Sequence, residues 1–399
     1  IMVTSKLNQR LLNTVLFIIS AVITLAGCKK QTTGKQHECP LFPIEVHIDG
    51  FDYYKFVNNK GLLAFDDKFD NANIFCDGIA KVSKGRKTYF IDMTGQTVLD
   101  YQAKGFSECS DFSEGIAWAM KGMDRSKAFA IDKEGNVLFE VPGIPITLFK
   151  DGLAGVKEST HSNAIAYYNN KGELVLPARK DYGGDRYFHQ GKISIVSYEK
   201  YSSGAYGAIN KEGELVVDYL SKIPVRFDEN NCAVVQSLEN GLYGLINQGG
   251  EYLIEPKFPY LHTDGGLYQF CESLDNPIAG WCNKNGDVVI EPIARLSSRW
   301  DLPGGAQMFY GDKWAFVKTD EGNAFIDRKG NIVLKTDFEA CSPFINNVAL
   351  VKDKHSYYGF IDRTGKLVSE DPFIFFIDNE KYIGEKVASD NPMGSLAWY

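Results

Sequence analysis

Short runs in which apolar residues alternate with polar ones recur along this chain, and one four-residue pattern separates many of them. The pattern is aspartate or asparagine, two variable residues and glycine, as in GLYGLINQGGEYLIEPKF from Gly241 to Phe258. Aspartate and asparagine suit the first position of a type I turn, because their side chains accept hydrogen bonds from backbone amides further along, and glycine suits the fourth. The pattern therefore predicts a hairpin in which one strand ends at the acid or amide and the next begins at the glycine.

Nine copies of this turn, spaced 34 to 44 residues apart, cover nearly all of the chain after its first segment. The turn glycines are Gly61, Gly95, Gly135, Gly172, Gly213, Gly250, Gly286, Gly330 and Gly365. Three residues after each glycine stands a residue that is apolar or easily buried, namely Ala64, Val98, Leu138, Val175, Val216, Leu253, Val289, Val333 and Val368. We therefore interpret the chain as an internal repeat.

A third apolar run precedes most of the turns, as in GIAKV at 78–82 and GIAWAM at 115–120. Each repeat of about 38 residues is then three short antiparallel strands, and the fold is expected to be all-β. A sheet this small cannot bury its own face, so neighbouring sheets must stack. We expect an open, curved solenoid, because nine three-stranded units lie outside the roughly four to eight four-stranded blades of common propellers; a closed, propeller-like ring is the alternative.

The clearest copies resemble the WG repeat, which is named for a Trp-Gly pair ahead of an apolar turn. Tyr243-Gly244, Tyr206-Gly207 and Tyr358-Gly359 occupy the position of that pair, and Trp itself never stands there. The resemblance extends over about residues 44 to 370. It implies a bacterial repeat domain, often taken to mediate interactions, and it carries over no catalytic residue.

The first residues have the layout of an export signal. Lys6 and Arg10 precede a short apolar run from Leu11 to Leu25, and Leu25-Ala26-Gly27-Cys28 follows. This ending resembles the lipobox of bacterial lipoproteins, which implies cleavage before Cys28 and attachment of lipid to it. A transmembrane anchor is the alternative, although the run is shorter than the roughly 20 apolar residues of a span. Lys29, where an Asp would resemble an inner-membrane retention signal, points to the outer membrane.

These features divide the chain into a lipoprotein signal peptide at residues 1–27, a lipid-attached tether at 28–40, the repeat array at 41–370 and a C-terminal cap at 371–399. The net charge of -8 disfavours bulk nucleic-acid binding, which needs a basic face. Seven cysteines remain after Cys28, so they are core thiols or include one disulfide. The histidines lack the spacing of a metal motif, and we expect no cofactor, no metal site and no catalytic residue.

Two recurring rows of side chains could contact a ligand. Basic residues mark most turn tips and either meet an anionic partner or keep exposed turns soluble: Lys60, Lys133, Lys171, Lys211, Lys284, Arg328, Lys329 and Arg363. Aromatic residues precede the apolar position of strand two and either pack in the core or stack on a ligand: Phe56, Phe90, Tyr167, Trp281, Phe325 and Phe360.

The sequence thus predicts a lipid-anchored protein of the bacterial cell envelope that acts as a non-enzymatic binding or scaffold module. Its partners would be the membrane, through the N-terminal lipid, and an unidentified protein or glycan. A divergent envelope hydrolase and a passive structural spacer are the alternatives. No residue is singled out as a contact to the ligand.

Overall fold

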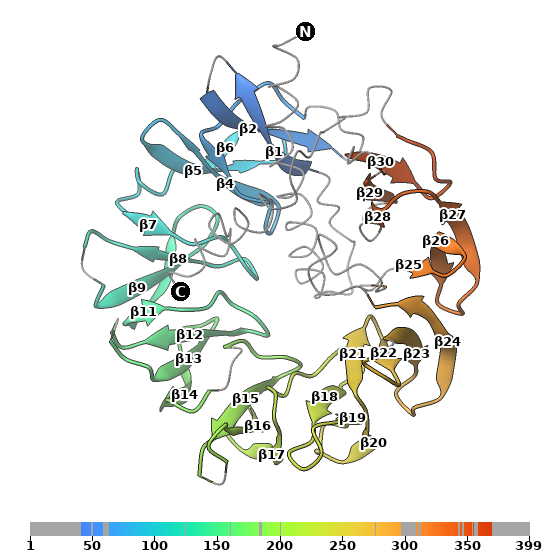
Figure 1. The fold of residues 1–399 in the computed structure, drawn as a ribbon. Coiled ribbons are helices and arrows are strands. Elements are labelled where there is room, and N and C mark those ends of the chain that lie inside the picture. The colour runs from blue at the N-terminus through green and yellow to red at the C-terminus, as the bar shows by residue number, and fades with distance from the viewer. Residues whose placement is uncertain are drawn as a thin grey trace. The chain divides into compact units, whose positions relative to one another are not determined.

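The computed structural model describes residues 41–48, 51–58, 64–123, 125–159, 161–182, 186–199, 201–275, 277–296, 309, 313–341, 344, 347–352, 354 and 358–368. The fold is all-β and consists of many small antiparallel sheets (Figure 1). Within the described residues no helix is long and apolar enough to cross a membrane. Cys28, Gly61, the signal peptide, the tether and the cap lie outside them. The chain forms two units, one of Ile1–Lys104 with Ser297–Trp398 and one of Gly105–Leu296.

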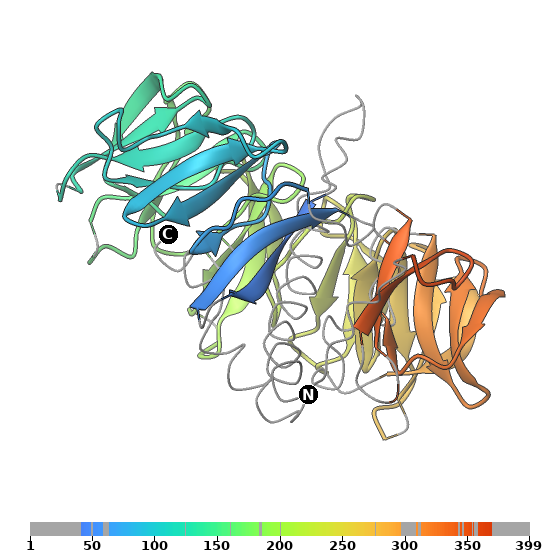
Figure 2. The ribbon, with the colours of Figure 1, turned by 90° about the horizontal axis from the view of Figure 1, so that it is seen from above.

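The second unit contains five sheets in chain order (Figures 1 and 2). The strands of the first two sheets are β7 (Glu108–Cys109), β8 (Ala117–Met120), β9 (Lys127–Ile131) and β10 (Val137–Pro142), then β11 (Ile144–Pro145), β12 (Leu153–Lys157), β13 (Ile165–Asn169) and β14 (Leu174–Arg179). The remaining three are β15 (Lys192–Ser197), β16 (Ala205–Asn210) and β17 (Leu215–Ser221), then β18 (Ala233–Gln236), β19 (Tyr243–Ile246) and β20 (Tyr252–Phe258), then β21 (Tyr260–Asp264), β22 (Leu267–Cys271), β23 (Ile278–Cys282) and β24 (Val288–Arg295).

The other unit contains the first and last sheets of the chain. At its N-terminal end are β1 (Leu41–Ile48) and β2 (Phe51–Asn58), then β3 (Asn71–Ala72), β4 (Ile79–Lys84), β5 (Lys87–Asp92) and β6 (Thr97–Leu99). At its C-terminal end are β25 (Trp314–Thr319), β26 (Gly322–Asp327) and β27 (Ile332–Thr336), then β28 (Ala340–Cys341), β29 (Val348–Lys352) and β30 (Tyr358–Asp362).

The number of strands per sheet differs from the expected three. The sheets that contain β3, β7, β11 and β21 have four strands. The extra strand arises because the segment joining two repeats runs antiparallel beside the next strand one, as where Ile144 and Pro145 pair with Lys157 and Val156. Pairing satisfies backbone groups that would otherwise be left without partners.

Every described turn glycine adopts the left-handed conformation. The φ angles of Gly95, Gly135, Gly172, Gly213, Gly250, Gly286, Gly330 and Gly365 lie between 80° and 85°. In each turn the glycine N–H donates to the carbonyl of the acid or amide, as from Gly250 to Asn247 at 3.1 Å. The Oδ1 atom of Asn247 also accepts from the amides of Gly249 and Glu251, at 2.9 and 3.1 Å. The side chain thus organises the whole turn.

The turn residue and the residue four positions later form an amide–carboxylate pair. Where the turn residue is asparagine, its Nδ2 donates to an acid: to Glu173 from Asn169, to Glu214 from Asn210, to Glu251 from Asn247 and to Asp287 from Asn283. Where it is Asp132 or Asp327, it accepts from Asn136 or Asn331, each at 3.0 Å. Six turns therefore contain the same charge-assisted hydrogen bond between an amide and a carboxylate. The amide belongs to the first residue of the turn in four of them and to the residue four positions later in the other two.

The turn aspartates make stability depend on pH. Hydrogen bonds from Thr94 and Thr364 and from backbone amides lower the pKa of Asp92 and Asp362. At Asp132 and Asp327 burial raises the pKa, but the hydrogen bonds outweigh it and the pKa is lowered. A lowered native pKa contributes stability that is present above the unfolded value of about 3.9 and is lost as pH falls through the native value.

We therefore expect the melting temperature of the wild-type chain to fall steeply below about pH 4. Replacing these four aspartates by asparagine should flatten that fall, because the amide still accepts the turn hydrogen bonds without titrating. Thermal unfolding followed by circular dichroism across the acid range measures this. The same substitution at the exposed Asp275 is the control. An identical acid profile for wild type and the four-turn variant would contradict the prediction.

Strand three bulges directly after the turn, and the bulge changes which residues are buried. Ile246 pairs with Tyr252 and Leu245 pairs with Ile254, so Leu253 is an extra residue in its strand. Tyr252 and Leu253 are both exposed, whereas Ile254 is buried. The same exposure corrects the expectation that the third residue after the glycine is easily buried, since five of these are exposed: Val98, Leu138, Leu253, Val289 and Val333.

Successive sheets meet in register at the turn glycines. A Cβ atom at Gly172 would lie 2.6 Å from the ring of Phe139 in the preceding sheet, and one at Gly213 would lie 3.2 Å from Leu176. The same relation joins Gly250 to Val217 and Gly286 to Ile254. In each pair the contacted residue is the fourth after the preceding turn glycine, so one contact repeats along the second unit.

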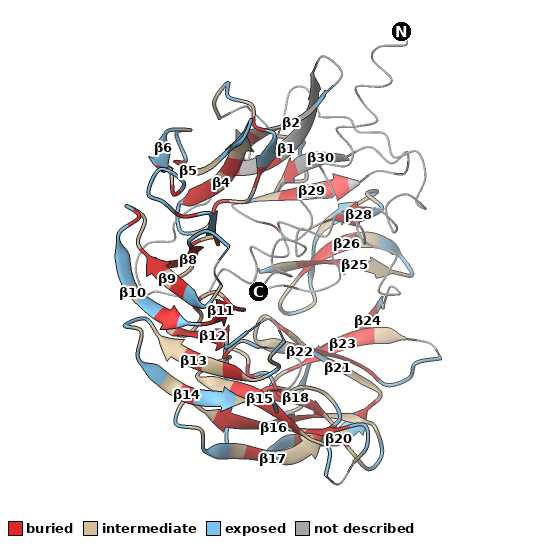
Figure 3. Cartoon of the chain, turned by 90° about the vertical axis from the view of Figure 1, so that its left-hand side faces the viewer, coloured by how far each residue is buried: buried red, intermediate tan, exposed pale blue. Residues whose placement is uncertain are grey.

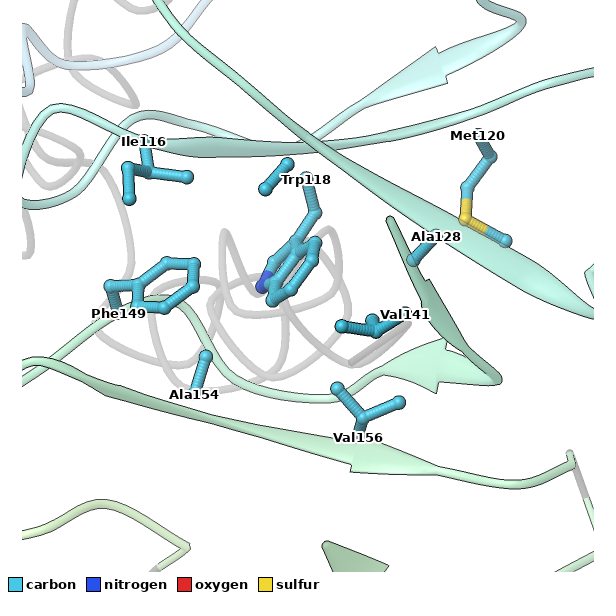
Figure 4. Close-up of a cluster of buried hydrophobic side chains, with 9 residues drawn as sticks. Ile116, Trp118, Met120, Ala128, Val141, Phe149, Ala154 and Val156 are labelled. Carbon is cyan, nitrogen blue, oxygen red and sulfur yellow. The ribbon is translucent and has the colours of Figure 1, made fainter. Parts of the chain in front are cut away.

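The cores lie between consecutive sheets. Trp118 of β8 stacks on Phe149 of the following repeat with ring centroids 5.1 Å apart, and Val156 of β12 belongs to the same cluster (Figure 4). The Trp118 Nε1 atom donates to the carbonyl of Thr147 at 3.1 Å, so the indole polar atom is also satisfied across the sheet boundary. Since each sheet is covered by its neighbours, both of its faces carry apolar residues.

Candidate binding surface

The last strand of each sheet in the second unit lies at the sheet edge: β10, β14, β17, β20 and β24. These strands expose large apolar side chains at the second and third positions after the turn glycine, with exposed fractions between 37% and 55%. We call the set the edge surface; it comprises Val137, Leu138, Leu174, Leu215, Tyr252, Leu253, Val288 and Val289. The bulge places these residues outside, because it shifts the inward position to the fourth residue after the glycine.

The edge surface is continuous along the second unit. Figure 3 shows β10, β14 and β17 following one another with exposed residues along them. The register contacts from Phe139 to Gly172, Leu176 to Gly213, and Val217 to Gly250 place each edge strand against the next turn. Exposed apolar groups that recur at one strand position in successive sheets differ from singly scattered surface residues, which makes the edge surface a candidate for binding.

Acidic residues bracket the apolar positions of the edge surface. The exposed acids on and directly before these strands are Glu140, Glu173, Glu214, Asp218, Glu251, Glu255, Asp287 and Glu291. Four of them, Glu173, Glu214, Glu251 and Asp287, accept the hydrogen bond from the turn asparagine. Their carboxylates are therefore held beside the first exposed apolar residue of β14, β17, β20 and β24.

Several basic residues at the turn tips contact the protein itself. Lys211 donates from Nζ to the carbonyl of Asp151. Arg363 lies over the rings of Trp314 and Phe344, with its guanidinium carbon 5.1 and 4.5 Å from their centroids, and Arg328 lies over Phe309 at 5.1 Å. These three side chains stabilise the packing of their own units. Lys60 lies outside the described residues.

The tight turn directly before strand one of a repeat supplies a further link between sheets. Glu114 and Asp151 both adopt positive φ, near 54°. Glu114 Oε2 accepts from the amide of Gly152 at 2.9 Å, and Asp151 Oδ2 accepts from the amide of Gly191 at 3.0 Å. Each acid thus holds the equivalent turn of the next repeat.

The row of aromatic residues ahead of the strand-two turn is buried. Phe56, Phe90, Tyr167, Trp281 and Phe325 are at most 1% exposed. They pack in the cores between sheets, as expected from the first of the two interpretations, and do not form a surface ladder. The side chain of Phe360 lies outside the described residues.

Two buried or half-buried carboxylates are engaged by aromatic donors. Trp281 Nε1 donates to Asp264 Oδ2 at 2.7 Å, and Asp264 is 2% exposed. Tyr268 donates to Asp228 Oδ2 at 2.7 Å, joining two consecutive repeats. Burial raises the pKa of Asp228, although the hydrogen bond from Tyr268 opposes this, and burial likewise raises the pKa of Tyr268.

The described cysteines are all free: Cys76, Cys109, Cys232, Cys271, Cys282 and Cys341. Burial raises the pKa of Cys341 well above its usual range, and it raises that of Cys282 to about 11. In the part of the chain that the structure describes, five of these thiols are buried core residues and Cys76 is half-buried. His189 lies in the turn before β15, where its backbone amide donates to Lys192. Across the described residues, no three histidine, cysteine or acidic side chains gather as a metal site.

Comparison with known proteins identifies the repeat. The family model for the WG containing repeat matches residues 90–122, 243–272 and 324–354. No curated protein matches the sequence.

Similar solved structures include the computationally designed protein Ika8, at 13% identity and a TM-score of 0.37, over 83% of this chain and 94% of that one. BamB from Moraxella catarrhalis is 11% identical with a TM-score of 0.36, over 80% and 90% of the two chains. Hsv2p from Kluyveromyces lactis is 11% identical with a TM-score of 0.30, over 71% and 89%. These structures are β-propellers. This chain carries WG-containing repeats at three positions in a fold of small antiparallel sheets.

Proposed function

We propose that this protein is a non-enzymatic scaffold of the bacterial cell envelope that binds a protein partner on the edge surface. The observation that carries the proposal is the recurrence of exposed apolar residues at one strand position in five consecutive sheets. Removing such side chains from water on binding is favourable by about 25 cal/mol per Å² of apolar area. A scaffold needs this kind of extended surface, in which several repeats each contribute a small part of the affinity.

A protein partner is favoured over a glycan by the chemistry of the exposed side chains. The edge surface is mostly aliphatic, as at Leu174, Leu215 and Val288. Exposed aromatic rings, which could stack on sugars, would favour a glycan, but Tyr252 is the one ring among the eight residues of the edge surface, and Tyr167 and Trp281 are buried between sheets. Aliphatic side chains instead suit the apolar core of a protein interface, surrounded by a polar rim.

The proposed anchor is the lipid on Cys28. The support for it is the order of basic residues, apolar run and lipobox at the start of the sequence. We propose that the lipid holds the protein at the outer membrane and that the short polar tether lets the repeats reach their partner. Incorporation of labelled fatty acid into the wild-type chain, and its loss in Cys28→Ala, is the expected result; equal labelling of both would refute the anchor.

We also propose that the nine repeats form an open, curved array. The support is their number, which exceeds the roughly four to eight blades of common propellers. Small-angle scattering distinguishes the two forms, since a closed ring gives a shorter maximum dimension and a central hollow. A scattering curve that fits only a closed ring would refute the open array.

The binding proposal is tested with the variant Leu215→Ser/Leu253→Ser. Both side chains are exposed, so stability should change by no more than about 0.5 kcal/mol per site. Leu274→Ser is the matched control, because Leu274 is 63% exposed but lies outside the edge strands. The tagged full-length chains are cross-linked in cells of the source bacterium and recovered in detergent.

We expect wild type and Leu274→Ser to capture the same defined envelope protein and the double variant to lose it. Capture that is unchanged in the double variant would refute the edge surface as the binding site. Failure of the wild-type chain to capture any protein would refute the scaffold function and favour a passive spacer.

A further inference from the structure

We propose that the partner presents to the edge surface a cationic polypeptide segment, in which lysine or arginine residues bracket apolar ones. This inference rests on the proposed scaffold function and adds the chemistry of the partner. The first observation is the order of residues along the edge strands β17, β20 and β24, where an acid stands at both ends of the apolar run. Glu251-Tyr252-Leu253-Ile254-Glu255 and Asp287-Val288-Val289-Ile290-Glu291 both place an exposed apolar pair between two exposed acids.

The spacing of these acids suits an extended polypeptide. Residues four apart in a strand are about 13 Å apart, because each residue advances the strand by about 3.3 Å. A partner segment in an extended conformation repeats its side chains on the same scale. Basic residues separated by apolar ones can therefore meet the two acids while the apolar side chains cover the pair between them.

The acids at the start of the edge strands are held in place before any partner arrives. The hydrogen bond from the turn asparagine to Glu214 is 2.8 Å long, and the one to Glu251 is 2.7 Å long. A carboxylate has about four acceptor sites on its two oxygens, so one amide donor does not exhaust it. Because these side chains are already ordered, binding does not have to immobilise them, and less entropy is lost.

Three cations near the edge strands have partners within the chain. Lys127 Nζ lies 2.7 Å from Glu140, and Arg179 forms two hydrogen bonds to Asp181 at 2.9 and 2.6 Å. Lys257 lies over the ring of Phe258 at 5.0 Å. On and directly before the edge strands, the eight exposed acids outnumber the three bases, which are Arg179, Lys257 and Arg295. This agrees with the net charge of -8 of the whole chain.

The charge of the edge surface selects among possible occupants. A second copy of this chain that used the same surface would bring acids against acids, and like charges across an interface are costly. Anionic lipid headgroups and nucleic acid are disfavoured for the same reason. A cationic polypeptide satisfies both the acids and the apolar pairs, so it is the occupant that the observations favour.

The test measures binding of fluorescent synthetic peptides to the full-length lipid-free chain by anisotropy. The probe, called the lysine–valine peptide, repeats Lys-Ser-Val-Ser, so that lysine and valine side chains lie on the same face of an extended strand. One comparison peptide repeats Lys-Ser-Ser-Ser and is called the lysine–serine peptide. Another repeats Glu-Ser-Val-Ser and is called the glutamate–valine peptide. The protein variants are wild type, Glu214→Gln/Glu251→Gln/Glu255→Gln/Asp287→Asn, and a control with four other exposed acids neutralised, Glu158→Gln/Glu199→Gln/Glu239→Gln/Glu272→Gln.

We expect the lysine–valine peptide to bind wild type and the control variant equally. The edge variant should bind it about tenfold more weakly at low salt, and added salt should reduce this difference. The lysine–serine peptide should bind more weakly than the lysine–valine peptide, because it cannot cover the apolar pairs. The glutamate–valine peptide should not bind.

Three results would overturn the inference: equal binding by the edge and control variants, equal binding of the lysine–serine and lysine–valine peptides, or no binding of any lysine peptide. Each of these leaves the scaffold function open to its own test, since an envelope protein captured through Leu215 and Leu253 could present a neutral segment. Failure of the wild-type chain to capture any envelope protein, by contrast, refutes the function whatever the peptides do.

Discussion

Replacing Gly244 by alanine is expected to lower the free energy of unfolding by about 3 kcal/mol. The φ angle of Gly244 is not in the left-handed region, so conformational strain is not the reason. A Cβ atom at this position would lie 2.6 Å from the carbonyl oxygen of Ile254 and 3.0 Å from the nitrogen of Pro256. Both atoms belong to the backbone of strand three, so the strand itself must move.

The close approach arises from a second bulge in strand three. Leu245 pairs with Ile254 and Tyr243 pairs with Phe258, so strand three has two extra residues opposite Gly244. The same two-residue excess lies opposite Gly207 and Gly280. Where the equivalent residue is Ala324, the pairing with Lys335 is regular. A glycine is therefore needed at this position where strand three has two extra residues opposite it.

Ala324→Gly is the matched control for Gly244→Ala. It should lower stability by only about 0.5–1 kcal/mol, the usual penalty for glycine in a strand. Both variants are measured by chemical unfolding followed by circular dichroism, with hydrogen exchange of β18, β19 and β20 as a local readout. If Gly244→Ala is no less stable than Ala324→Gly, the glycine is not required by the bulge.

Replacing Trp281 by phenylalanine is expected to lower the free energy of unfolding by about 3–4 kcal/mol. The indole is fully buried, so the smaller ring leaves a cavity. The substitution also removes the donor that lies 2.7 Å from Asp264 Oδ2, in a place where water does not reach the carboxylate. Chemical unfolding followed by fluorescence and circular dichroism measures the loss.

A double-mutant cycle separates the hydrogen bond from the cavity. In the background of Asp264→Asn the same Trp281→Phe substitution should be less harmful by about 1.5–3 kcal/mol, because a neutral amide needs the donor less than a carboxylate does. The cavity is the same in both backgrounds, so it cancels. A coupling energy near zero would show that Trp281 stabilises the fold by packing alone.

Much of the local fold could be predicted from the sequence because a short pattern determines the turn. Asp92, Asn210 and the equivalent residues accept the turn hydrogen bonds through their own side chains, so the information lies within five residues. The buried row that includes Ile91, Ile131 and Ile246 likewise follows from the position of the turn. Tertiary context has little to add at these positions.

The edge surface could not be predicted because strict alternation along strand three fails at the bulge. Alternation gives Tyr252 and Leu253 opposite faces, whereas the extra residue leaves both exposed and turns Ile254 inward. One signal in the sequence does mark the second bulge. Glu255-Pro256 and Glu291-Pro292 place a proline, which has no N–H to pair, in the bulged segment opposite a glycine.

The functions of the turn lysines and the number of strands also depend on contacts between repeats. Lys211 reaches Asp151, which is 60 residues away in sequence. The extra strand β11 forms only because the segment that joins two repeats lies beside β12, the first strand of the following repeat. Neither contact leaves a mark in the repeat pattern, since both depend on how one sheet is placed against the next.

Site-specific photo-cross-linking in the cells that produce the protein tests most directly whether the proposed partner binds the edge surface. A photoreactive phenylalanine analogue replaces Leu253 in one strain and Leu274 in another; both native residues are exposed, but only Leu253 belongs to the edge surface. The account predicts a covalent adduct with one envelope protein from position 253 and none from position 274. The reverse pattern, or the same adducts from both positions, would contradict it.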